Sequence, residues 1–224
     1  MPITHWVVTN SLKGLTRVLC RVEYSRLRSV PSQGPLILVC NHINFIEAPI
    51  MYTHLMPRPV TTMAKVETWD NPFVGALFDL VQAIPVERGT ADLSAIHAGL
   101  DALRQGKILV ITPEGTRSGH GRLLKAHPGV VTLALHSGAP LLPLVYYGNE
   151  AFQHNIRRLQ RTDFRIRVGQ PFHLDAHGAT ITRPVRQKMA DEIMYQLALL
   201  LPPQYRGAYA DLELMTTDYI QSLN

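Results

Sequence analysis

Leu36-Ile37-Leu38-Val39-Cys40, followed directly by Asn41-His42, is the stretch that decides the fold of this chain. An uninterrupted apolar run between the turn-forming segment 31–35 and a polar pair is typical of a short strand buried on both faces. Such strands belong to α/β sheets, in which ligand sites lie just beyond the carboxyl ends of the strands. The position of Asn41 and His42 therefore indicates a functional site.

The rest of the chain continues the alternation of strands and helices. Apolar runs predict further strands at 60–66, 83–86, 107–112, 140–147 and 164–168. Because the last of these alternates apolar and basic residues, we expect it to be half-exposed and near a sheet edge. Helical patterns fall at 47–56, 71–80, 91–104, 128–137, 184–201 and 209–223. The stretch 148–163 is expected to be irregular. We predict an α/β protein, a single layered αβα domain with a mixed, largely parallel sheet.

The first 24 residues predict an amphipathic helix that precedes a domain over 25–224. Lys13, Arg17 and Arg21 form a basic stripe beside an apolar face. That face carries Val8, Leu12, Leu15, Leu19 and Val22. Three interpretations stay open: a helix packed on the domain, a basic anchor lying on a membrane surface, or an oligomer contact. Polar residues follow Trp6 too soon for a signal-peptide core or a membrane span, so we expect no segment to cross a bilayer.

Composition restricts the partners and the compartment. Of the 224 residues 46% are hydrophobic and 17% are charged, which suits one folded domain. The formal net charge of +5 favours an anionic partner such as a membrane phosphate, a nucleotide phosphate or nucleic acid. We expect no nucleic acid, because the basic residues lack the aromatic interleaving that single-strand binders use. Cys20 and Cys40 provide no disulfide framework, which favours a reducing compartment and the cytoplasmic side.

The first candidate site is the pair His42 and Glu47, which are five positions apart. On a regular helix their side chains would diverge by about 140°, so a turn must lie between them. With such a turn, Glu47 can accept a hydrogen bond from one ring nitrogen and leave the other as a proton acceptor. The pair would then be a general base for a hydroxyl group, although a purely structural histidine remains an alternative. Cys40 is a weak rival nucleophile, because strand cysteines are usually buried packing residues.

Two further blocks follow predicted strands. Pro113-Glu114-Gly115-Thr116-Arg117-Ser118 combines a glycine, small polar side chains and an arginine, which suits phosphate oxygens. Val86-Glu87-Arg88-Gly89 ends another strand, and Lys65 ends the strand before it. Taken singly, each block is more often an ordinary turn or a solvated arginine. The combination is what indicates an anion site. No Gly-x-Ser-x-Gly elbow of an α/β-hydrolase occurs.

In order and spacing these blocks resemble the glycerolipid acyltransferase family over most of the chain. His42 and Glu47 stand at the family's His-x4-Asp motif, with Glu47 in place of the usual Asp. The second block is matched by Lys65, Glu67, Pro72, Gly75 and Arg88, with Ala83 where Gly is frequent. The Glu-Gly-Thr-Arg block is matched by Glu114, Gly115, Thr116 and Arg117. The last apolar block and the family ending are matched by Pro140, Pro143 and residues 201–207.

The resemblance implies an O-acyltransferase, with residues 25–224 as the acyltransferase domain. His42, oriented by Glu47, would deprotonate the free hydroxyl of lysophosphatidic acid or a related lysophospholipid. The hydroxyl would attack the thioester of acyl-CoA or acyl carrier protein directly, without a cofactor or a metal. The acceptor phosphate would be held by Lys65, Arg88, Glu114, Gly115, Thr116 and Arg117.

The resemblance also implies a peripheral protein on the cytoplasmic face of a membrane. Because Glu47 departs from the family pattern, a second hypothesis is a catalytically idle lipid-binding or scaffold protein that keeps the fold.

Overall fold

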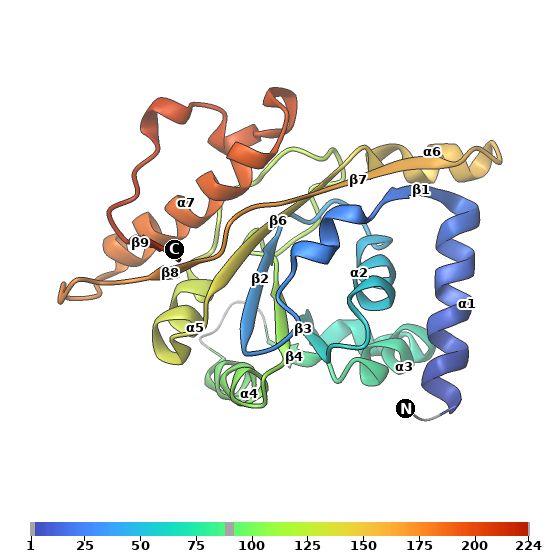
Figure 1. Ribbon diagram of the computed structural model, residues 1–224, viewed down its shortest axis with the longest axis horizontal. Helices are drawn as coiled ribbons and strands as arrows, with labels where there is room; N and C mark the ends of the chain where they lie inside the picture. Colours follow the sequence, from blue (N-terminus) through green and yellow to red (C-terminus); the bar gives the residue numbers. More distant parts are fainter. Residues whose placement is uncertain (1–2, 88–91, 224) are drawn as a thin grey trace.

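A mixed sheet runs through the middle of the molecule, with helices on both of its faces (Figure 1). The computed structural model describes residues 3–87 and 92–223. The strand order is β1-β7-β6-β2-β5-β3-β4, with β8 beside β6 and β9 beside β8. The strands are β1 (Cys20–Glu23), β2 (Leu36–Cys40), β3 (Val60–Lys65), β4 (Ile84–Val86), β5 (Ile108–Ile111), β6 (Leu141–Tyr147), β7 (Thr162–Val168), β8 (Phe172–Leu174) and β9 (Ile220–Ser222).

The centre of the sheet is parallel. Strands β6, β2, β5, β3 and β4 all run in one direction. Strand β7 runs antiparallel to β6, and β1 lies parallel to β7 at the outer edge. Strands β8 and β9 add antiparallel pairs. The predicted class, α/β with a mixed and largely parallel sheet, is therefore confirmed.

Each face of the sheet has its own apolar core, and β2 contributes to both. Ile37 and Val39 point into the cluster that also contains the inner faces of α4, α5 and α7. Leu36, Leu38 and Cys40 belong to the other cluster, under α2. The two clusters lie on opposite sides of the sheet, so this strand is buried on both faces as its sequence predicts. The helices are α1 (Ile3–Leu19), α2 (Glu47–Leu55), α3 (Pro72–Leu80), α4 (Leu93–Arg104), α5 (Gly129–Ser137), α6 (Phe152–Arg157) and α7 (Arg183–Leu200).

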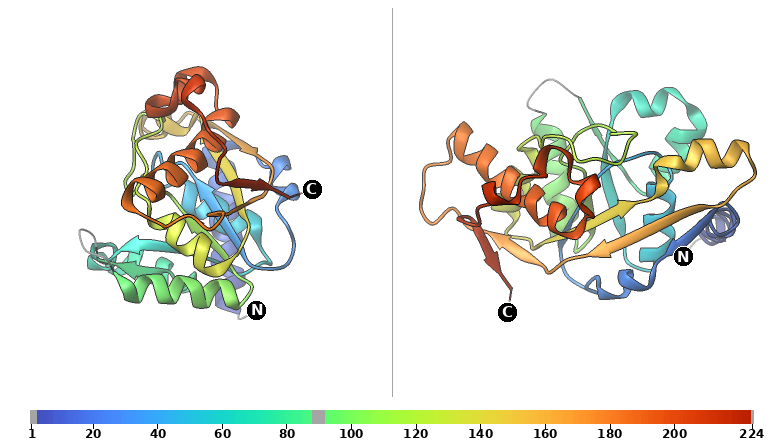
Figure 2. Two further views of the ribbon diagram at one scale, coloured as in Figure 1. Left: turned by 90° about the vertical axis from the view of Figure 1, so that its left-hand side faces the viewer. Right: turned by 90° about the horizontal axis from the view of Figure 1, so that it is seen from above.

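The N-terminal helix is present but shorter than predicted. Helix α1 ends at Leu19, and residues 20–23 form β1, which pairs in parallel with β7. Cys20-Arg21-Val22-Glu23 alternates buried or half-buried with exposed side chains, a period that fits an edge strand once a partner strand is available. Strand β7 has the predicted half-exposed pattern and lies next to the edge strand. Helix α1 packs against α2 at one end of the molecule (Figure 2).

The prediction of a helix at 209–223 is wrong. The chain forms short 3₁₀ turns there, and β9 pairs with β8. Tertiary contacts explain the difference, because the buried carboxylate of Glu192 on α7 accepts hydrogen bonds from the Thr216 hydroxyl and from the backbone N–H groups of Asp218 and Tyr219. These backbone donors would otherwise serve a helix.

The stretch 148–163 is also more ordered than expected. It contains α6, which buries Phe152 in the core under α2. One buried aromatic side chain stabilises a helix that is too short to be recognised from its periodicity.

Candidate active site

The carboxyl ends of the five parallel strands lie along one edge of the sheet. His42 follows β2, and Glu114 follows the neighbouring strand β5. On the other side of β2, Asn149 follows β6. Loops that leave adjacent parallel strands at the same edge are neighbours in space, which is why residues more than 70 positions apart meet here.

At the centre of the site His42 is held by Glu47. The Nδ1 atom of His42 lies 2.6 Å from Oε2 of Glu47, and the side chains are 29% and 6% exposed. Glu47 also accepts hydrogen bonds from the backbone N–H groups of Ile43 and Asn44. Since an ionised carboxylate only accepts hydrogen bonds, Nδ1 of His42 is the donor in this pair. A neutral imidazole then has Nε2 as its proton acceptor, on a side chain that is partly exposed.

The turn that the spacing of His42 and Glu47 requires is present. Asn41, the first residue after β2, is buried and exchanges two hydrogen bonds with the backbone of Tyr146 on β6. Asn44 accepts the N–H of Ile46 and donates its amide to the carbonyl of Asn149. Helix α2 then begins at Glu47 itself. The segment between strand and helix is thus tied to β6, and it turns the acid back towards the imidazole.

Glu114 holds the same segment from the other side. Its Oε1 accepts the backbone N–H of His42 at 2.8 Å, and its Oε2 accepts the N–H of Leu124 at 2.9 Å. Burial raises the pKa of Glu114 to about 7, against the opposing effect of these two donors. Both carboxylate oxygens face the protein backbone. The contacts of Glu114 therefore position the loops around the site.

The Gly115-Thr116-Arg117 turn lies against the His42 segment. The N–H of Ser118 donates to the carbonyl of His42 at 2.8 Å, and the N–H of Gly119 donates to that of Ile43. Gly115 has a φ of +65°, a conformation that favours glycine. Thr116 and Arg117 are exposed. Their side chains are accessible to a ligand at the same edge as the imidazole.

Lys65 stands further along the edge. Lys65 is the last residue of β3 and is exposed. Arg88 lies outside the described residues. The strand order β2-β5-β3-β4 places the ends of β3 and β4 beyond the Gly115 turn, when counted from His42. This order lines up His42, the Gly115 turn and Lys65 along one edge of the sheet.

Sequence reasoning missed Asn149. Its Nδ2 donates to Oε1 of Glu47 at 2.7 Å, and the residue is completely buried. The signal was present, because a polar residue follows an apolar strand and Gly148, as His42 follows β2 and Asn41. Only the strand order shows that β6 lies beside β2.

Cys40 has no access to this site. Its side chain is completely buried, and burial raises the pKa of its thiol to about 12. The Tyr146 hydroxyl donates to its sulfur at 3.5 Å. A thiol in this environment is a packing group, as the sequence predicts.

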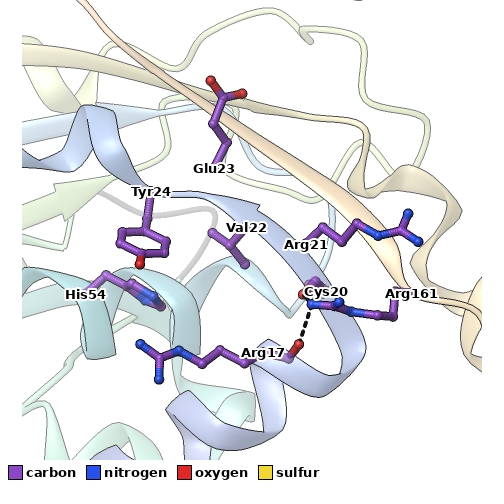
Figure 3. A pocket seen from close by; sticks show the side chains of 8 residues that line it. All are labelled: Arg17, Cys20, Arg21, Val22, Glu23, Tyr24, His54 and Arg161. Carbon is purple, nitrogen blue, oxygen red and sulfur yellow. Dashed lines mark hydrogen bonds between the residues drawn. The ribbon is translucent and has the colours of Figure 1, made fainter.

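A cavity of about 360 Å³ lies elsewhere, between α1, β1, α2 and Arg161. Figure 3 shows Arg161 reaching back to the end of α1, where its guanidinium donates to the carbonyls of Arg17 and Cys20. Arg21 pairs with Asp163 on β7. Two of the three arginines that line the cavity therefore have protein partners. Among the residues that the structure describes, none of the candidate site lines it.

The fold and the site define a chain of the glycerolipid acyltransferase type. The sequence model of the family described as Acyltransferase matches residues 21–147, and the chain belongs to this family. It is an O-acyltransferase by class.

Individual relatives agree with this assignment. The chain is 26% identical to a 1-acyl-sn-glycerol-3-phosphate acyltransferase of Bacillus subtilis over 73% of this chain and 80% of that protein. It is 23% identical to the Pseudomonas aeruginosa protein of the same name over 88% and 77%. The fold matches the crystal structure of PlsC from Thermotoga maritima, the 1-acyl-sn-glycerophosphate acyltransferase, with a TM-score of 0.61, 20% identity and coverage of 84% and 77%.

Proposed function

We propose that this chain transfers a fatty acyl group from the thioester of acyl-CoA or acyl carrier protein to the free hydroxyl of lysophosphatidic acid or a related lysophospholipid. The observation that carries the proposal is the 2.6 Å contact between His42 Nδ1 and Glu47 Oε2. It supports the presence of an oriented general base at a sheet edge, beside an exposed arginine turn. The names of the relatives support the choice of acceptor.

The reaction is a direct acyl transfer. Nε2 of His42 takes the proton of the acceptor hydroxyl as its oxygen attacks the thioester carbonyl carbon. The tetrahedral intermediate then collapses, the carbon–sulfur bond breaks, and the imidazolium returns the proton to the leaving thiolate. An ester and a free thiol result, and His42 is neutral again. The thioester is already activated, so the proposal includes no cofactor.

The acceptor phosphate would lie along the line of strand ends next to His42. Thr116 and Arg117 are exposed there, and Lys65 ends β3 one strand further on. In our proposal these side chains, with Arg88, bind the phosphate oxygens. Binding the phosphate would orient the glycerol hydroxyl towards Nε2, and such orientation contributes much of the rate in transfers between two bound molecules.

We also propose that the protein works on the cytoplasmic face of a membrane, with α1 against the lipid. Helix α1 buries Thr9 and Thr16, while Trp6, Leu15 and Val18 are 62%, 54% and 68% exposed. A helix that buries threonines while it leaves large apolar side chains exposed favours a lipid surface as partner. Within residues 3–87 and 92–223, no helix has the length and apolar character needed to span a bilayer.

Glu47 in place of Asp is the reason to consider a catalytically idle protein. That substitution leaves the contact with His42 in place, because the turn before α2 brings the longer side chain to Nδ1. This contact therefore weakens the reason, taken from the sequence, to expect a catalytically idle protein. Binding to liposomes with no turnover by wild type or His42→Ala would restore it.

The decisive experiment measures labelled acyl transfer from acyl-CoA and from acyl carrier protein to a panel of lysolipids and glycerol 3-phosphate. We expect lysophosphatidic acid to be acylated, and His42→Ala to lower the rate by about 10²- to 10⁴-fold, the usual contribution of a positioned base. His97→Ala, at an exposed position on α4, is the control. No transfer by wild type to any acceptor, or full activity of His42→Ala, would overturn the proposal.

A further inference from the structure

Asn149 contacts the general-base pair from a third strand end. It follows β6 and lies in a short 3₁₀ turn. Its amide donates to Oε1 of Glu47 at 2.7 Å, while Oε2 of the same carboxylate faces Nδ1 of His42 at 2.6 Å. The three side chains form a continuous chain of hydrogen bonds from the β6 end to the imidazole.

Burial of the Asn149 amide is unfavourable for the free energy of folding. The side chain is completely buried, and its Oδ1 has no hydrogen-bond partner among the described residues. An unsatisfied buried acceptor is unfavourable, and an apolar side chain of similar size would avoid that cost. The opposite orientation of the amide would place Oδ1 against the Glu47 carboxylate, which is worse. The favourable interaction that this arrangement provides is the bond from Nδ2 to Glu47.

Glu47 needs such a partner more than a shorter acid would. Glutamate has one more rotatable bond than aspartate, so its carboxylate has more orientations to choose from. Oε1 accepts from Ile43 N at 3.1 Å, Asn44 N at 2.8 Å and Asn149 Nδ2 at 2.7 Å. With Oε1 fixed by these donors, Oε2 is turned towards His42. Of the three donors, only Asn149 contributes a side chain.

We propose that Asn149 is a positioning residue for acyl transfer, which acts through Glu47 to hold the His42 imidazole in its reactive tautomer and direction. The inference rests on the proposed function, because it concerns how the same base is oriented. Asn149 itself does not touch the reacting atoms. Its loss lowers the fraction of enzyme in which Nε2 faces the hydroxyl, so the change falls on kcat rather than on the KM of the acceptor.

The fold allows a clean test. The backbone carbonyl of Asn149 accepts the amide of Asn44, and this bond does not depend on the Asn149 side chain. Asn149→Leu removes the donor and keeps the branched shape and the number of side-chain heavy atoms. Asn155→Leu is the matched control, because its amide also donates to a side chain, the Thr162 hydroxyl, in the same connection between β6 and β7. Thermal unfolding of both variants checks that they fold.

We expect Asn149→Leu to lower kcat by about 10- to 100-fold, the effect of losing one hydrogen bond to a charged group, with little change in KM. Asn155→Leu keeps wild-type kcat. In a Glu47→Ala background, Asn149→Leu should change kcat by less than about twofold, because its effect passes through the missing carboxylate. A purely structural role would instead lower activity equally in both backgrounds.

A second readout does not depend on turnover. In wild type, the Nδ1 proton of His42 in its 2.6 Å bond should give a far-downfield proton NMR signal that His42→Ala removes. In Asn149→Leu this signal should move upfield or broaden. An unchanged signal together with unchanged kcat would overturn the inference while leaving acyl transfer intact. If wild type itself transfers no acyl group, the proposed function fails instead. The NMR signal then tests by itself whether Asn149 positions the His42 imidazole through Glu47.

Discussion

The backbone N–H of His42 donates to the side chain of Glu114 at 2.8 Å, although the two residues are 72 positions apart in the chain. The loop after β5 thereby fixes the backbone of His42. In return, the carbonyl of His42 accepts the N–H of Ser118. The loop that holds the exposed arginine and the loop that holds the imidazole are thus one hydrogen-bonded unit. The positions of the His42 imidazole and the Arg117 turn are coupled for this reason.

Glu114 makes stability depend on pH. Burial raises its pKa to about 7, so between pH 4.5 and 7 the folded protein binds a proton that the unfolded chain has released. The contribution of this group to the free energy of unfolding therefore falls as pH rises through that window. We expect the stability of Glu114→Gln relative to wild type to improve by about 2–3 kcal/mol from pH 4.5 to pH 7.5. Urea unfolding of both proteins at several pH values measures this difference.

At any single pH we expect Glu114→Gln to be less stable than wild type, because the NH₂ of the new amide faces one of the two backbone N–H donors. Glu213→Gln, at an exposed position, is the control and should show no trend. A constant difference between wild type and Glu114→Gln across the window would contradict the raised pKa.

Alanine substitutions at Gly115 and Gly119 distinguish an effect of backbone strain on stability from an effect on acceptor binding. Both have positive φ, +65° and +70°, so alanine at either position should cost about 1 kcal/mol of stability. A Cβ at Gly119 meets nothing within 4 Å, whereas one at Gly115 comes within 3.0 Å of the His127 ring. We expect Gly115→Ala to lower the melting temperature at least as much as Gly119→Ala does, and to raise the KM for the acceptor, which Gly119→Ala leaves unchanged. Equal KM values would place the phosphate elsewhere.

Substitution of Arg117 should weaken binding of the acceptor phosphate and leave the other steps of the reaction unchanged. A lost charge-assisted contact raises KM for lysophosphatidic acid by about 10- to 100-fold in Arg117→Ala. The same variant should acylate monoacylglycerol, which has no phosphate, as slowly as wild type does. Arg122→Ala is the control, since Arg122 is exposed in the same loop. A loss of activity that is equal for both acceptors would show that Arg117 serves the fold or the donor.

The outer face of α1 should govern vesicle binding. Trp6 and Val18 are exposed on it, so the double variant Trp6→Ser, Val18→Ser should bind anionic vesicles about 10- to 100-fold more weakly in sedimentation. Leu214→Ser removes an equally exposed apolar side chain, 68% like Val18, from the C-terminal segment and should bind normally. Unchanged sedimentation of the double variant would exclude α1 as the lipid contact.

Several elements follow from local sequence alone. The apolar run before Asn41 predicts a strand buried on both faces, and it is one, because a run with no polar position fits only a strand between two helical layers. Helix α7 lies at 183–200, where the pattern predicts 184–201, because Thr182 caps it and Pro202 prevents its continuation. The position of His42 just beyond the end of a strand also follows from local sequence. These features depend on near neighbours in the chain.

Other features were decided only by contacts between distant segments. Residues 20–23 leave the helical pattern because β7 offers them a partner, and 209–223 is held out of a helix by Glu192. Asn149 becomes part of the site only because β6 lies next to β2. The sequence determined the layers and the pairing of His42 with Glu47, since periodicity and spacing are local properties. Strand order and the partners of buried polar groups are non-local, so the tertiary structure alone decided them.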